Sequence, residues 1–260
     1  MKLIEVFFNR DVFILVPAAF FIIFAVTEIF FRIGRLIRSK AIPEQEIMLE
    51  FMPGALISML ALLLAFTVSM AEARYDSRQK IAINETNAIG TAYLRAGLLE
   101  CPARSEIDKL LRKYVDLRLE FYRMNSKPSL QSLQSDIWRL AAESGRKHPG
   151  DVTIGLFLNS LNEMIDQAET QSAAFENQIP AIIIALLFAS SILVMAAVGY
   201  ASGLEKGRRL LFTSILSIII AMTLFVILDL DRPRRGTVHP SQEGMNRLKM
   251  SMLGASAPCP

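Results

Sequence analysis

The sequence is poor in the residues that carry catalytic and metal chemistry. It contains two histidines, His148 and His239, and two cysteines, Cys101 and Cys259, among 260 residues. No spacing of these residues matches a zinc site, and no glycine-rich loop is present that could hold a phosphate. Two distant cysteines make no disulfide framework, so both are expected to be free thiols. The chain is therefore predicted not to be an enzyme and to need no metal and no cofactor.

Charge is also missing, over four long stretches of a chain that is 52% hydrophobic. One stretch carries a single acid, Glu28, and the other three are uncharged: Val12–Phe31, Phe51–Ala71, Ile179–Leu204 and Leu210–Leu228. A helix of roughly 20 residues crosses the roughly 30 Å hydrocarbon core of a bilayer, and lipid leaves backbone groups no other partners. Basic residues rather than a cleavage site follow the first stretch, so it is read as a retained span. The sequence predicts a multi-pass protein of the cell (inner) membrane.

The second stretch has no stop signal at its end. Neither a proline nor a paired glycine occurs between Ala71 and Gly90, so this membrane helix should continue into a charged, aqueous helix. Amphipathic spacing predicts further helices at Arg104–Met124, Leu130–Arg146 and Thr153–Asn177. The expected fold is all-α, with four transmembrane helices and a helical extramembrane domain inserted between the second and the third. The expected divisions are a membrane helix pair at 1–74, the extramembrane domain at 75–177, a second pair at 178–230 and a tail at 231–260.

Four blocks of the sequence resemble the bestrophin-like membrane family of bacteria, a domain of unknown function. They are LLLAFTVSMAEARYDSRQKIAINETNAIGTAYLR from Leu62, YVDLRLEFY at 114–122, LNEMIDQAE at 161–169 and LDLDRPRRG at 228–236. A fainter resemblance extends to true bestrophins, which are pentameric anion channels. The resemblance implies an oligomeric ion channel, a homo-oligomer in the lipid bilayer that conducts ions. The alternative is a non-conducting membrane scaffold or sensor whose helical domain binds a partner protein. The modest net charge of +3 implies no nucleic-acid partner.

The resemblance also points to candidate pore residues. In bestrophins, apolar side chains spaced four apart on the second span line the neck of the pore. Transferring this pattern onto Ala65-Phe66, and following the same helical face onward, gives seven candidates: Ser58, Leu62, Phe66, Ser69, Ala73, Asp76 and Lys80. Small residues on this face suit close helix packing without conduction equally well. Asp76 and Lys80 can pair with each other, so their charges indicate no ion selectivity.

Charged residues near the span ends are predicted to be structural. The predicted cluster comprises Arg74, Arg78, Asp229, Asp231, Arg232 and Arg235. Arg74 and Arg78 lie on the opposite side of the helix from the candidate pore face. We expect them to pair with acids such as Asp229 or Asp231. In bestrophins an acidic run after the fourth span binds calcium. Arginines interrupt that run here, so no calcium site is predicted. Glu28 either pairs with Arg32 or lines an ion path.

The charge pattern and the resemblance to bestrophins predict opposite orientations in the membrane. Seven basic residues lie in the two short loops, and eight lie near the spans on the side of the central domain. The short loops carry more weight in the positive-inside rule, which favours short loops in the cytoplasm. The resemblance to bestrophins instead places both termini and the central domain inside, and this second orientation is the expectation.

Overall fold

The computed structural model describes residues 12–38, 43–123, 130–205, 210–232 and 237–254. The described residues fall into two compact units. The membrane unit comprises Met1–Arg74 and Gln178–Val238, and the helical unit comprises Tyr75–Asn177 and His239–Pro260. No strand occurs in the described ranges. The helices are α2 (Val12–Ile37), α3 (Pro43–Ala96), α4 (Ala103–Arg123), α5 (Gln131–Lys147), α6 (Val152–Glu176), α7 (Ala181–Leu204), α8 (Leu210–Asp231) and α9 (Glu243–Gly254). The all-helical prediction is confirmed.

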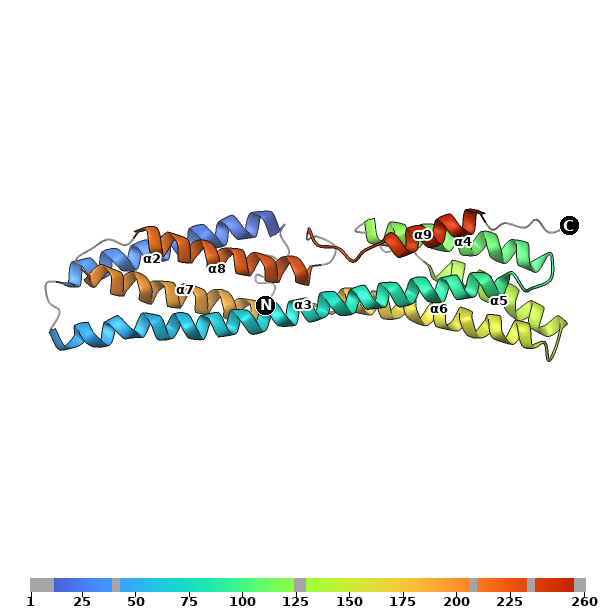
Figure 1. Ribbon diagram of the computed structural model, residues 1–260, viewed down its shortest axis with the longest axis horizontal. Helices are drawn as coiled ribbons and strands as arrows, with labels where there is room; N and C mark the ends of the chain where they lie inside the picture. The colour runs from blue at the N-terminus through green and yellow to red at the C-terminus, as the bar shows by residue number, and fades with distance from the viewer. Residues whose placement is uncertain (1–11, 39–42, 124–129, 206–209, 233–236, 255–260) are drawn as a thin grey trace. The chain divides into compact units, whose positions relative to one another are not determined.

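Helix α3 belongs to both units. It is a single helix of 54 residues, Pro43–Ala96, and Figure 1 shows it as an uninterrupted ribbon. The predicted continuation of the second apolar stretch into a charged helix is therefore confirmed. The helix also begins earlier than the apolar stretch, and it contains Pro53 in its interior. Helix α3 thus contributes side chains to both units.

The membrane unit packs α2, α7, α8 and the first part of α3 around an apolar core. Leu60, Leu64 and Ala71 of α3 share this core with residues of α2, α7 and α8. Among the described residues, three stretches are long and apolar enough to cross a membrane: Met52–Ala96, Val152–Leu204 and Leu210–Asp231. The expected first span, Val12–Phe31, lies in α2, and the side chains of its first five residues fall outside the description. The four-span topology remains a prediction.

Helices α2 and α7 approach each other so closely that only glycine fits between them. Gly199 and Gly203 form a Gly-xxx-Gly pair on α7. On α2, Gly34 faces Gly203 and the backbone of Thr27 faces Gly199. A Cβ atom built on Gly203 would lie 2.9 Å from the backbone nitrogen of Arg35 and 3.1 Å from Cα of Gly34. Small residues allow this backbone contact between membrane helices. The pair fixes the distance between α2 and α7.

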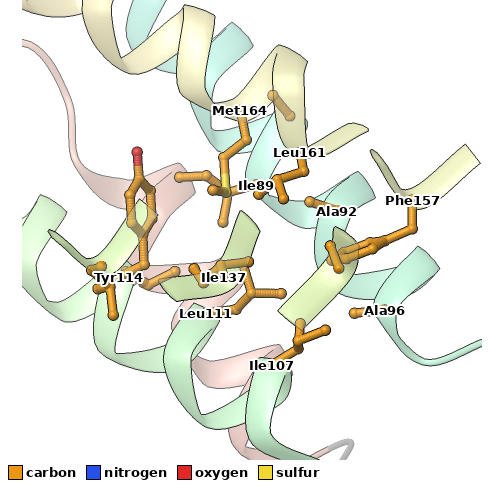
Figure 2. Packing of buried hydrophobic residues seen from close by; sticks show 14 of the residues in the cluster. Ile89, Ala92, Ala96, Ile107, Leu111, Tyr114, Ile137, Phe157, Leu161 and Met164 are labelled. Atoms are coloured by element: carbon orange, nitrogen blue, oxygen red, sulfur yellow. The ribbon is translucent and has the colours of Figure 1, made fainter. Parts of the chain in front are cut away.

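The helical unit packs α4, α5, α6 and α9 against the second part of α3. Figure 2 shows Ile89 and Ala92 of α3 facing Leu111 and Tyr114 of α4 and Met164 of α6. These side chains recur at three- and four-residue spacing, which places them on the inner face of each helix. The three helices predicted between the second and third spans are confirmed as α4, α5 and α6, with ends within two residues of expectation.

The segment after residue 231, expected as a tail, contains α9, which buries Met245 and Met252 in the core of the helical unit. The division of the chain at residue 231 stays a prediction. Cys101 is disulfide-bonded rather than a free thiol. The only other cysteine of the sequence, Cys259, lies outside the described residues. The packing of α9 against α4 has no local sequence signal.

Candidate functional site

One face of α3 is exposed along its whole described length, and the seven candidate pore residues lie on it. We call this set the exposed stripe: Ser58, Leu62, Phe66, Ser69, Ala73, Asp76 and Lys80, all of which are exposed. Leu62 is 57% exposed and Phe66 is 66% exposed, which is high for large apolar side chains. The opposite face is buried and carries Leu60, Leu64, Thr67 and Ala71. Helical periodicity thus separates a buried packing face of α3 from an exposed face.

The exposed stripe changes character along the helix. Its first part is apolar, with Leu62 and Phe66 as the bulky side chains. Its last part is charged, because Asp76 and Lys80 form an ion pair with Nζ 3.0 Å from Oδ2. This i,i+4 pair was predicted from the sequence and is confirmed. Because the two charges offset each other, the stripe offers a polar surface without a net sign.

An apolar groove of about 470 Å³ lies beside the stripe, between α3 and α8. Its floor on α3 includes Ala61, Ala65 and Ser69, spaced four residues apart, and Ile219 and Thr223 line it from α8. The small side chains leave room for another helix to approach the backbone of α3. The groove is therefore shaped for helix packing and offers no polar chemistry along most of its length.

A second groove, of about 400 Å³, lies within the helical unit between α3 and α6. Its lining is polar and rich in amides, with Asn84, Asn87 and Thr91 on α3 and Asn159 and Gln167 on α6. Asn87 and Thr91 extend the exposed stripe at helical spacing. A polar surface therefore follows the charged part of the stripe, and Arg95 of α3 and Glu163 of α6 are the charged residues of its lining.

Three members of the predicted charge cluster, Arg78, Asp229 and Asp231, make side-chain hydrogen bonds to backbone atoms. Arg78 is 1% exposed, and its Nε and Nη2 donate to the carbonyl oxygens of Ala174 and Asn177, at 3.2 Å and 3.4 Å. These carbonyls belong to the last turn and the cap of α6, where no helical partner exists. A cation there also meets the negative end of the helix dipole. The proposed pairing of Arg74 or Arg78 with Asp229 or Asp231 stays a prediction.

The two aspartates at the end of α8 hold backbone amides in place. Oδ1 of Asp231 accepts a hydrogen bond from the backbone nitrogen of Ile179 at 2.8 Å, just before α7 begins. Both carboxylate oxygens of Asp229 accept from Thr237, at 2.6 Å from the backbone nitrogen and 2.6 Å from the hydroxyl. Arg232 follows α8 and donates its backbone N–H to the carbonyl of Asp229. Arg235 lies outside the described residues.

The Glu28–Arg32 ion pair predicted for the end of the first span is present, with Nε 3.1 Å from Oε1. The Arg32 side chain is 74% exposed and the Glu28 side chain 22% exposed. Within the described residues, no group of three histidine, cysteine or acidic side chains is close enough to hold a metal ion.

A buried ion pair in the helical unit was not foreseen from the sequence. Glu85 of α3 and Arg118 of α4 are fully buried, and Nη2 of Arg118 donates to Oε2 of Glu85 at 2.8 Å. The Arg118 guanidinium also stacks 4.5 Å above the centre of the Phe121 ring. Burial raises the pKa of the neighbouring Tyr114 hydroxyl to about 12. The sequence feature that could have predicted the ion pair is the position of Glu85 and Arg118 on the apolar faces of their helices.

These features define an α-helical membrane protein in which residues of one long helix, α3, are exposed in both units. The chain belongs to the Bestrophin-like family, because the Bestrophin-like domain matches residues 19–244. The resemblance stated from the sequence blocks is thereby confirmed. A comparison with curated proteins found no match.

The fold is similar to that of solved bacterial structures. A bacterial Bestrophin homolog from Klebsiella pneumoniae with a tryptophan-to-alanine mutation has a TM-score of 0.66 and 15% identity, and the match covers 92% of this chain and 97% of that chain. The same homolog with a tyrosine-to-alanine mutation gives a TM-score of 0.64 and 14% identity, over 92% of this chain and 98% of that chain. A membrane protein with a glycine-to-alanine mutation gives a TM-score of 0.62 and 16% identity, over 94% of this chain and 99% of that chain. At these identities the likeness shows the fold alone.

Proposed function

We propose that this protein is a homo-oligomeric ion channel of the inner membrane, in which the exposed stripe of α3 lines the conducting path. The observation that carries the proposal is the exposure of all seven stripe residues in a helix whose other face is buried. Bestrophin homologues are oligomeric membrane channels and not enzymes. A pentamer is the stoichiometry that the family favours, and the polypeptide then has no catalytic role.

Within this proposal, the parts of the stripe have different roles. Leu62 and Phe66 of each subunit narrow the path, and such an apolar ring gates by expelling water. Asp76, Lys80 and Asn87 form the wetter section that follows. The apolar groove along Ala61 and Ala65 receives a helix of the neighbouring subunit, since small residues let helices pack closely.

The experiment is ion flux through the purified protein in liposomes. Phe66→Ala removes bulk from the proposed ring, and Leu62→Ser makes it more polar, so both variants should raise flux above wild type. Phe212→Ala and Leu193→Ser are the matched controls, because Phe212 is 70% and Leu193 69% exposed on other helices of the membrane unit. These controls should leave flux unchanged. Equal effects of Phe66→Ala and Phe212→Ala would show that Phe66 faces lipid like any exposed apolar residue.

The competing function is a non-conducting scaffold or sensor whose helical unit binds a partner protein. The polar groove between α3 and α6 is the observation in its favour, because its amide lining suits protein recognition as well as water. The oligomeric state of the detergent-solubilised particle separates the two functions. A ring of subunits with measurable flux supports the channel, whereas a monomer or dimer without flux supports the scaffold.

A further inference from the structure

The polar groove between α3 and α6 has a floor of small side chains. Ala88 of α3 is 7% exposed and Ser160 of α6 is 3% exposed, and their small size leaves a hollow between the two helices. The volume of about 400 Å³ lies within the range of roughly 300–1,000 Å³ that is typical of small-molecule sites. All of its lining residues belong to the helical unit. Because the lining is polar, a ligand of this groove must itself be polar.

Three asparagines in the lining are not used by the fold. The side chains of Asn84, Asn87 and Asn159 make no hydrogen bond to any other described residue. All three lie in helix interiors, where asparagine is less favourable than alanine. Each side-chain amide offers two N–H donors and one carbonyl acceptor. These amides are therefore available to a ligand that carries both hydrogen-bond donors and acceptors.

Two charged side chains of the lining are held in place before a ligand arrives. Nη1 of Arg95 donates to the carbonyl oxygen of Leu156 at 2.9 Å, and Oε1 of Glu163 accepts from Nε2 of Gln167 at 2.7 Å. Leu156 and Glu163 are seven residues apart on α6, which corresponds to about 10 Å along the helix. The groove thus presents one cation and one anion at a set separation, and such preorganisation lowers the cost of binding.

We infer that this groove binds a short zwitterionic peptide of about three residues. Three extended residues span about 10 Å, so the terminal carboxylate reaches Arg95 while the terminal ammonium reaches Glu163. The guanidinium keeps N–H groups for a charge-assisted contact with the carboxylate. The N–H and C=O groups of the peptide backbone pair with the asparagine amides along the walls.

The lining also argues against other polar ligands. None of the described lining residues is aromatic, so the groove offers no ring on which a nucleobase could stack. One arginine and one glutamate balance each other, so a ligand with a large net charge of either sign is not favoured. The inference goes beyond ion conduction and does not depend on it.

The first test is a calorimetric titration of the purified full chain in detergent with triglycine. Wild type should bind triglycine saturably. N-acetyl-triglycine lacks the ammonium and triglycine amide lacks the carboxylate, so each should bind at least about tenfold more weakly. Glycine should also bind more weakly, because its two charges are too close together to reach both groups. Absence of saturable triglycine binding, or equal affinity for the free and the blocked peptides, would overturn the inference.

The second test assigns each end of the peptide to one side chain. Glu163→Gln should remove the preference for triglycine over N-acetyl-triglycine and keep the preference over triglycine amide, and Arg95→Gln should do the converse. Glu169→Gln of α6 and Arg139→Gln of α5 are the matched controls, since both residues are exposed outside the groove, and these variants should keep both preferences.

Each readout of the second test is a ratio of affinities within one variant, so a general loss of stability does not imitate it. A Glu163→Gln protein that still prefers triglycine over N-acetyl-triglycine would overturn the assignment of the ammonium. The titrations measure no ion flux, so their failure would leave the channel proposal standing.

Discussion

The contact between α2 and α7 makes a sharp prediction about stability. Replacing Gly203 by alanine adds a Cβ that would lie 2.9 Å from the Arg35 backbone nitrogen and 3.1 Å from Cα of Gly34. These atoms belong to the backbone of α2 and cannot turn away as a side chain would. The two helices must therefore move apart, which loosens the packing on both sides of the contact.

The size of this effect follows from the cost of overpacking. Inserting a methyl group into a well-packed site costs about 1–3 kcal/mol, and a site walled by backbone belongs at the upper end of this range. For a chain of this size, each kcal/mol lowers the unfolding midpoint by roughly 2–4 °C. We expect Gly203→Ala to lose roughly 2–3 kcal/mol. Gly199→Ala should behave similarly, because its Cβ would lie 3.0 Å from the carbonyl carbon of Thr27.

The assay is thermal unfolding of the purified protein in one detergent, followed by circular dichroism. Gly54→Ala is the matched control, because Gly54 is also a helical glycine of the membrane unit but has nothing within 4 Å of the added Cβ. Alanine there removes backbone freedom from the unfolded chain, so this variant should be neutral or more stable by up to about 1 kcal/mol. Equal midpoints for Gly203→Ala and Gly54→Ala would refute the close approach of α2 and α7.

Two further predictions concern the core of the helical unit. Glu85→Gln or Arg118→Met alone leaves one buried charge without its partner and should lower the free energy of unfolding by about 3–5 kcal/mol. Glu85→Leu combined with Arg118→Met removes both charges and should recover most of this loss in denaturant unfolding. A double variant as unstable as the single variants would contradict the pairing. Tyr114 has its pKa raised to about 12 by burial, above its ordinary value of 10.0, so the folded state holds the proton more tightly. The stability that this provides is complete below pH 10 and is lost as the pH rises through about 12. Tyr114→Phe should reduce the decrease in the free energy of unfolding between pH 10 and about pH 12. An unchanged decrease over this pH range would argue against burial of the hydroxyl.

Much of the architecture was already determined by local sequence. Uncharged stretches of about 20 residues determine membrane helices because hydrocarbon offers backbone groups no other partner. The absence of a helix breaker between Ala71 and Gly90 determined the continuity of α3, and i,i+4 spacing determined the Asp76–Lys80 and Glu28–Arg32 pairs. These features depend only on residues within a few turns of one another, so a linear reading is sufficient to predict them.

The exposed stripe was determined partly by the local sequence and partly by the tertiary structure. The helical period placed Leu62 and Phe66 on one face, but the period alone does not say which face of α3 is turned to its neighbours. Packing against the core of the membrane unit buried Leu60 and Leu64 and left the other face open. The candidate pore face therefore needed both the sequence register and the tertiary contacts.

Contacts between distant segments were decided only by the tertiary structure. Glu85 and Arg118 are 33 residues apart, and each looked like a surface charge until packing of α3 on α4 removed both from water. The packing of α9 likewise depends on the return of the C-terminal segment to the helical unit. Such contacts depend on which apolar faces meet, and many alternative pairings share the same local pattern. The free energy of burial, summed over the whole core, selects one of them, and no short window of sequence contains that sum.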